Sequence, residues 1–308
     1  ALSVINIILK KGKDEGLNAS LTAAAGFKDY SGGLFTINNK NKNVNFYINS
    51  SYNHSNPITI SSSQSEYFSN NNTTSFLNEN IESNNKRVAF YGTVGADFYL
   101  SNRSTLSTSL NFLNTTIKSN TLTTSEIFDA TFNSLQLNDR TLLRDFDNEM
   151  VEFVTEFTHN FKKEGETFTT SVIYTKDSDR FDNTITNTNT NFTDENFIEN
   201  IKLSKTSVKF EYINPISENS TYSFGFKGDY LKVPFKYTNI NEVKNIDYAE
   251  KINAVFVDFV SQFDKFYYEI GLRAELLEMK ADYLKLNNLQ KNNFNNLLAT
   301  LKLEYCFS

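Results

Sequence analysis

The feature that most constrains the fold is an alternation of apolar and polar residues with a period of two, which recurs along almost the whole chain. Successive side chains of a β-strand point to opposite faces, so this pattern predicts strands with one apolar and one polar face. No comparable run shows the 3.6-residue period of an amphipathic helix. The alternating segments are residues 17–27, 44–52, 106–112, 151–161, 168–174, 208–212, 222–226, 255–259, 268–276 and 297–307.

The number and length of these segments point to a particular all-β fold. With two less regular runs at residues 35–37 and 90–100, the chain holds about twelve strands. Many are about 10–14 residues long, against the five or six usual in globular sheets, and this is the length that a tilted strand needs to cross a bilayer. The prediction is an all-β, antiparallel meander of about twelve long amphipathic strands that forms a partial or closed transmembrane β-barrel.

The connections between the strands alternate in length. Short polar turns fall at residues 39–43, 101–104, 162–166, 214–220 and 262–265. Between them lie long stretches rich in Asn, Ser and Thr, at roughly residues 56–85, 118–145, 177–198, 233–249 and 281–293. Short turns at one rim and long loops at the other are typical of an outer-membrane barrel whose short turns are periplasmic.

Composition excludes several other classes of protein. The net charge of −6 makes nucleic acid an unfavourable partner. No window approaches 18 consecutive apolar residues, so a helical membrane span is excluded. Cys306 is the single cysteine, so no internal disulfide can form. The 28 Phe and 16 Tyr residues argue against wholesale disorder. Period-two alternation also suits a soluble antiparallel sheet, so a secreted β-protein stays open as an alternative.

The sequence has few residues of the types that catalyse reactions or bind metal ions. His54 and His159 each stand apart from any His, Cys or carboxylate at metal-ligand spacing, and His159 is expected at a rim. We therefore expect no enzyme activity, no catalytic residue, no metal site and no cofactor.

The charged residues of the last two alternating segments all occupy the positions that point to the polar face of the strand. If the apolar face of these strands meets lipid, the charged face points into the barrel lumen, where it stays hydrated. The lumen-facing candidates are Glu269, Arg273, Glu275, Lys302 and Glu304.

The opening residues differ from all that follows. An apolar run, Val-Ile-Asn-Ile-Ile-Leu at residues 4–9, is closed by Lys-Lys-Gly at residues 10–12. Residues 3–12 resemble the junction between plug and barrel in TonB-dependent outer-membrane receptors. This resemblance implies that residues 1–15 are the C-terminal tail of a plug domain and that residues 16–308 are an outer-membrane β-barrel. The implied junction residues are Val4, Ile5, Asn6, Ile7, Ile8, Lys10 and Lys11.

Three further landmarks resemble the same family in the same order. Gly95–Ser107 resembles its strand-turn-strand unit, Phe210–Ile216 its Tyr-x-x-Pro-Leu turn, and Ile270–Glu275 its Gly-Leu-Arg-x-Glu strand. A complete barrel of that family has 22 strands, so the chain is expected to be roughly the first half of such a barrel and the sheet to be incomplete. Residues 17–27 and 297–307 would then be edges that do not pair with each other.

The resemblance implies a function in the outer membrane of a Gram-negative bacterium. It implies TonB-dependent uptake of a scarce solute, either a metal chelate or an oligosaccharide. The implied partners are outer-membrane lipid, the solute and, in the full-length protein, the TonB energy-coupling complex. Two alternatives remain open: a self-contained twelve-stranded diffusion pore, and a soluble extracellular adhesin-like β-protein.

Overall fold

The computed structural model describes residues 15–27, 29–69, 72–283 and 288–305, and these residues form one antiparallel sheet of 13 strands. No helix among them is long and apolar enough to cross a membrane. The predicted all-β meander is confirmed. The strands are β1 (Gly16–Gly26), β2 (Tyr30–Lys40), β3 (Val44–Ser55), β4 (Ile58–Ser69), β5 (Asn72–Ser101), β6 (Ser104–Asp129), β7 (Ser134–Asn160), β8 (Thr167–Asn187), β9 (Glu195–Ser217), β10 (Ser220–Asn239), β11 (Val243–Phe263), β12 (Phe266–Tyr283) and β13 (Asn288–Tyr305).

One strand more than the expected twelve is present, and the extra strand is β4. β3 pairs with residues 87–98 of β5, and β4 pairs with residues 72–84 along the same edge of β5. β4 therefore branches off the main path of the sheet. The Ser-rich composition of this segment predicts a long loop, and this prediction is wrong because β4 forms a full ladder with β5.

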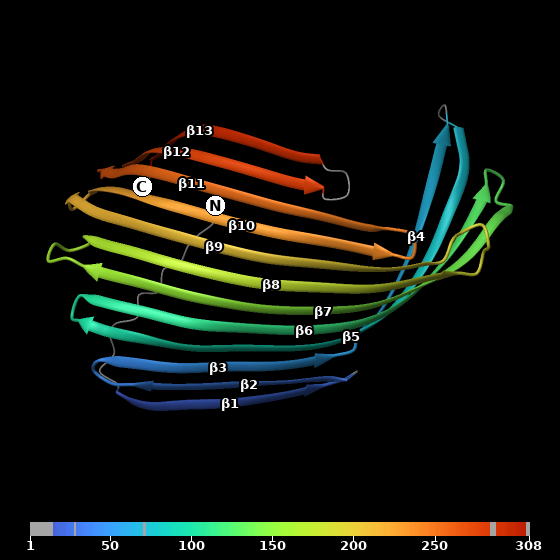
Figure 1. The fold of residues 1–308 in the computed structure, drawn as a ribbon, viewed down its shortest axis with the longest axis horizontal. Helices are drawn as coiled ribbons and strands as arrows, with labels where there is room; N and C mark the ends of the chain where they lie inside the picture. The colour runs from blue at the N-terminus through green and yellow to red at the C-terminus, as the bar shows by residue number, and fades with distance from the viewer. Residues whose placement is uncertain (1–14, 28, 70–71, 284–287, 306–308) are drawn as a thin grey trace.

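The long Asn/Ser/Thr-rich stretches were also predicted wrongly as loops, because most of their residues continue the strands. β5, β6 and β7 reach 30, 26 and 27 residues. Backbone hydrogen bonds supply the ladder whatever the side chains are, and Thr is a good strand former. Figure 1 shows the far ends of β4 to β8 bending away from the rest of the sheet.

The predicted alternation of the two rims is confirmed, although the connections are shorter than expected. Because consecutive strands are antiparallel, the turns at residues 102–103 and 161–166 lie at one end of the sheet, which we call the short-turn rim. The connections at residues 130–133, 188–194 and 240–242 lie at the opposite end. The expected turn at residues 214–220 shrinks to residues 218–219, and Pro215 lies within β9.

The sheet is open, as expected for an incomplete barrel. β1 pairs with β2 and β13 with β12, and the described residues form no ladder between β1 and β13. Figure 1 shows these two strands at opposite sides of the sheet. Each therefore leaves one row of backbone N–H and C=O groups without a strand partner.

Close packing between strands makes one glycine sensitive to substitution. A Cβ atom at Gly225 of β10 would lie 2.4 Å from the Phe210 carbonyl oxygen and 2.5 Å from the Phe256 ring. We expect Gly225→Ala to lower the free energy of unfolding in lipid by about 1–3 kcal/mol. Gly33→Ala is the control, because the nearest atom would be an unstrained 3.6 Å away. Equal denaturation midpoints for the two variants would contradict this packing.

The hairpin that joins β6 to β7 is held by the carboxylate of Asp129. This carboxylate accepts hydrogen bonds from the backbone N–H groups of Thr131 and Asn133, at 2.8 and 2.9 Å, and from both side chains. The bonds from Asn133 and Thr131 lower the pKa of Asp129 to about 2. They also hold Phe132, with φ of 63°, in position to stack on Phe76 with ring centroids 4.3 Å apart.

The hairpin tip should therefore lose order in acid. A lowered pKa means that the carboxylate stabilises the tip above its ordinary pKa of 3.8 and that this contribution is lost as the pH falls towards about 2. Amide protection factors at Thr131 and Asn133 should drop across that window. In Asp129→Asn the side-chain oxygen can still accept the backbone bonds, so the drop should disappear. Protection that is independent of pH in the wild type would rule out this role for Asp129.

Candidate membrane interface and lumen wall

One face of the sheet, here called the apolar face, carries large exposed hydrophobic side chains. Val257 lies directly opposite Phe224 on β10 and Leu272 on β12, and the three are 47%, 44% and 46% exposed. Leu301 and Phe153 on the same face are likewise exposed. This excludes a sealed core around these side chains, and it confirms their predicted exposure. That this face points outward stays a prediction. Such an extensive apolar surface is suited to lipid contact rather than to water.

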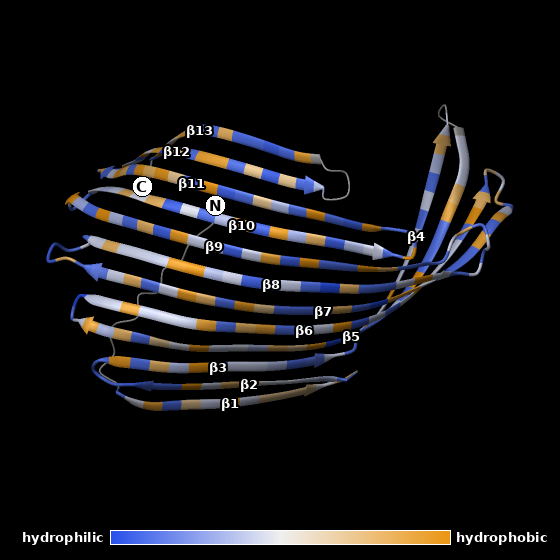
Figure 2. Ribbon diagram, in the orientation of Figure 1, coloured by the Kyte–Doolittle hydropathy of each residue, from blue (hydrophilic) through white to orange (hydrophobic). Residues whose placement is uncertain are grey.

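The densest run of apolar residues on this face, here called the apolar band, has the same length on β7 and β12. On β7 and the residue after it, the band extends from Val151 to Phe161, with Glu149 next on the same face. On β12 it extends from Phe266 to Leu276, with Glu278 next on the same face. Ten steps of about 3.3 Å give about 33 Å along the strand, or about 25 Å of height at a tilt near 40°. That height matches the hydrocarbon band of an outer-membrane barrel. Figure 2 shows hydrophobic positions alternating along the strands.

Aromatic rings gather on the apolar face near the short-turn rim. Phe161 packs edge-on against Tyr212, with centroids 5.8 Å apart, and Tyr212 lies 5.4 Å from Phe224. Phe266 and Tyr305 make a similar contact at 4.8 Å. Tyr212 and Tyr305 combine an apolar ring with a polar hydroxyl, which favours the boundary between hydrocarbon and water. This rim is therefore positioned like the aromatic girdle of a membrane barrel.

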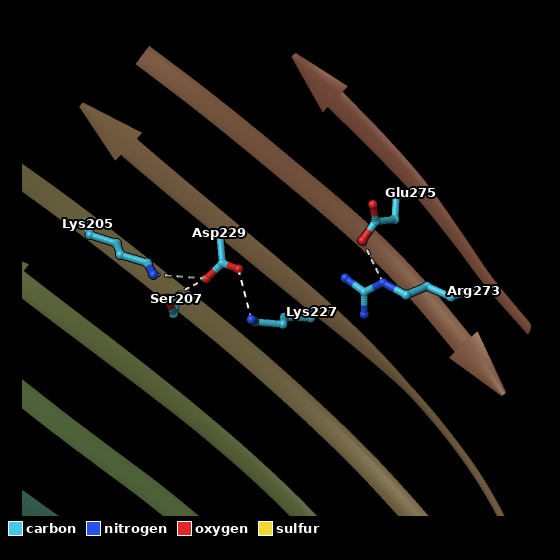
Figure 3. Close-up of polar contacts among 6 residues, drawn as sticks. All are labelled: Lys205, Ser207, Lys227, Asp229, Arg273 and Glu275. Atoms are coloured by element: carbon cyan, nitrogen blue, oxygen red, sulfur yellow. Dashed lines mark hydrogen bonds and ion pairs between the residues drawn. The ribbon is translucent and has the colours of Figure 1, made fainter. Parts of the chain in front are cut away.

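The opposite face, here called the polar face, holds all five predicted lumen candidates. Arg273 Nε donates a hydrogen bond to Glu275 Oε1 at 2.6 Å (Figure 3). Lys302 Nζ lies 2.9 Å from Glu304 Oε1, and Glu269 lies directly opposite Lys302 in the ladder. The structure thus brings the candidates together on two adjacent strands. Their role in lining a lumen stays a prediction.

A second charged cluster on the polar face was missed by the sequence reading. Asp229 on β10 accepts a hydrogen bond from the Ser207 hydroxyl, and its other oxygen lies 3.1 Å from Lys227 Nζ (Figure 3). Lys205 approaches the same carboxylate at 4.0 Å. The Lys-x-Asp spacing at residues 227–229 could have predicted this pair, because residues two apart on a strand lie on the same face. Lysines from β9 and β10 also line a cleft of about 360 Å³ together with Asp258 and Arg273.

His159 pairs with a serine on the neighbouring strand. His159 lies at the end of β7, at the predicted rim, and its Nδ1 atom is 2.8 Å from the Ser104 hydroxyl. Only the cross-strand register reveals this pair, so sequence reading missed it. Within the ranges that the structure describes, no carboxylate hydrogen-bonds to His159 and no three potential metal ligands cluster. The plug-junction residues 4–11 and Cys306 lie outside those ranges.

Comparison with known proteins agrees with this geometry. Residues 159–308, just under half of the chain, match the model of the outer membrane protein beta-barrel family. The chain is an outer-membrane β-barrel protein, and its location is the outer membrane of a Gram-negative bacterium. The comparison with curated proteins finds no match.

Two solved outer-membrane structures are distantly similar. The outer-membrane protease OmpT of Escherichia coli is 10% identical, with a TM-score of 0.30, and the alignment covers 86% of this chain and 97% of that one. The alcaligin receptor FauA of Bordetella pertussis is 10% identical, with a TM-score of 0.25, covering 95% of this chain and 62% of the receptor. Neither likeness is close enough to transfer structural or functional detail.

Proposed function

We propose that the chain is part of an outer-membrane receptor that takes up a scarce, large solute with energy from the TonB complex. The observation that carries this proposal is the pair of unpaired edges, β1 and β13. A sheet in lipid must pair every backbone group, so further strands are needed to bridge the two edges. Because barrel diameter grows with strand number, the completed barrel would be wide enough for a large solute.

The polar face supplies the wall of the proposed passage. Glu269, Arg273 and Glu275 on β12, with the Asp229 cluster on β9 and β10, give a hydrated surface with both signs of charge. Residues 4–11 are proposed to connect this barrel to a plug, which would contact the same wall. The solute is proposed to be a metal chelate or an oligosaccharide. No catalytic step is proposed.

The test is uptake by cells that carry the full-length gene product containing this chain. Labelled ferric chelates and labelled oligosaccharides of defined length are offered to cells with and without a functional TonB complex. The proposal predicts uptake of one class that falls to background when TonB is removed.

The two alternatives give different results in the same experiment. A self-contained diffusion pore would leave uptake unchanged without TonB and would conduct ions steadily in planar bilayers. A soluble adhesin would give no uptake. Either outcome would overturn the proposed function.

A further inference from the structure

A cleft of about 440 Å³ lies on the polar face near the rim opposite the short-turn rim. Its lining comes from β5 to β9 and from the connection at residues 188–194. On β7 the lining begins at Arg140, eleven positions beyond Val151 at the end of the apolar band. This separation is about 36 Å along the strand, so the cleft lies in water beyond the hydrocarbon. Because the short turns of an outer-membrane barrel are periplasmic, this end of the sheet is the exterior end.

The cleft lies on the inner side of a bend in the sheet. Figure 1 shows the far ends of β5 to β8 bending away from the other strands. Side chains converge and bury one another on the concave side of such a bend. Within β6 to β8, as far as the structure describes them, every buried side chain has polar-face parity, and these residues are Thr115, Asn138, Asn148, Asn183 and Ile185. The polar face is therefore concave here, as ligand sites are.

The connection between β8 and β9 forms one wall of the cleft, and hydrogen bonds fix it to the end of β7. Asn189 donates from its side chain to the Leu137 carbonyl and from its backbone N–H to Asn138 Oδ1, each at 3.1 Å. Asn187 Nδ2 donates to the Thr193 carbonyl at 3.1 Å. The wall is thus held in place by the protein itself, which lowers the entropy cost of binding a ligand.

Several side chains of the lining have hydrogen-bonding capacity that the protein does not use. No described residue forms a hydrogen bond or ion pair with the Arg140 guanidinium, the Gln136 amide or the Glu195 carboxylate. The Glu79 carboxylate accepts only two long bonds from serine hydroxyls, at 3.4 and 3.5 Å. The Phe192 ring is 45% exposed and stacks on no ring in the described part of the chain. These groups are available to a ligand.

The available groups match the chemistry of an uncharged sugar. Sugar hydroxyls both donate and accept hydrogen bonds, and the cleft supplies carboxylates as acceptors and a guanidinium and an amide as donors. The C–H face of a sugar ring is apolar and packs on an aromatic ring such as Phe192. Leu77, Ile127 and Ile185 add apolar surface to the lining. The two carboxylates outnumber the single guanidinium, which disfavours an anionic ligand.

We propose that this cleft binds a short segment of an uncharged oligosaccharide, an inference that rests on the proposed function and identifies its solute as a sugar rather than a metal chelate. Glu79 and Glu195 accept hydrogen bonds from sugar hydroxyls, and Arg140 donates to sugar oxygens. Phe192 packs on the C–H face of one ring. The volume falls within the range of about 300–1,000 Å³ for small-molecule sites, so the cleft holds a short segment and not a whole polymer.

The experiment measures binding of neutral glucan, mannan, xylan and fructan oligosaccharides to the purified full-length protein in detergent, by titration calorimetry. The wild type should bind at least one of these four classes. The double variant Arg140→Gln, Glu195→Gln should raise the Kd about tenfold, because hydrogen bonds to charged groups are the strong ones. The matched control is Arg87→Gln, Glu199→Gln, which removes the same two charges from the polar face of β5 and β9 outside the cleft. It should bind as the wild type does.

Phe192 tests the stacking contact separately. Phe192→Tyr keeps the ring and should keep the affinity, whereas Phe192→Leu keeps an apolar side chain without a flat ring and should raise the Kd about fivefold. The side chains of Arg140 and Glu195 form no hydrogen bond or ion pair with the described residues, so their replacement should leave the amount of protein in the outer membrane unchanged. Equal affinity of the tyrosine and leucine variants would overturn the stacking contact.

The remaining outcomes separate this proposal from the proposed function. Wild-type protein that binds none of the four oligosaccharide classes would overturn the cleft as a sugar site, and so would equal loss in the double variant and its control. A ferric catecholate chelate that binds the wild type and loses affinity in the double variant would also overturn it. Sugar uptake that needs TonB but is unchanged in the double variant would overturn the cleft alone. Sugar binding that the double variant loses, together with uptake independent of TonB, would overturn the proposed function alone.

Discussion

Replacing Val257 by arginine is expected to lower the stability of the protein in lipid by about 2–4 kcal/mol. Val257 lies within the apolar band, 47% exposed and flanked by Phe224 and Leu272, so an arginine there must enter hydrocarbon. The measurement is the free energy of unfolding from denaturant titration in lipid vesicles, together with the amount of protein in the outer-membrane fraction.

The matched control for this substitution is Ser223→Arg. Ser223 lies on the polar face of β10, directly opposite Asp258, so the new cation has a carboxylate beside it and no lipid contact. We expect a change of less than about 0.5 kcal/mol. Equal losses at the two positions would show that the apolar face does not meet lipid, and the membrane orientation of the sheet would be wrong.

The second large effect concerns the open edges. As a separate molecule the chain should insert poorly into vesicles and aggregate, because β1 and β13 present unpaired backbone groups. In detergent micelles, alternate amides of these two strands should exchange with opening free energies near 0 kcal/mol. Amides in the middle of β7 and β8, which have partners on both sides, should reach the global stability.

Uniform protection would contradict that expectation. If every amide of β1 and β13 is protected as well as those of β7, the two edges have joined in a closed barrel. The chain would then be a self-contained pore, and steady conductance in planar bilayers would follow. Strand association between two copies would also protect the edges, and size measurement in detergent distinguishes such a dimer from a closed monomer.

Much of the fold follows from local sequence. The period-two pattern assigns each side chain to a face because the pleat of a strand fixes this alternation, and Leu272, Leu301 and Arg273 all lie on the predicted faces. The length of the apolar runs likewise predicted the membrane band, because bilayer thickness fixes how many residues must be apolar. These properties depend on a residue and its neighbours along one strand.

What the tertiary structure decided depends on pairing between strands. The sequence gives no direct measure of register, so it did not reveal that His159 meets Ser104 or that Lys86 lies opposite Lys118. Backbone hydrogen bonds also carried polar stretches such as β4 into the sheet, where composition had suggested loops. The tertiary structure also decides whether the sheet closes into a barrel. Contact between β1 and β13 depends on the summed twist and curvature of all the strands between them.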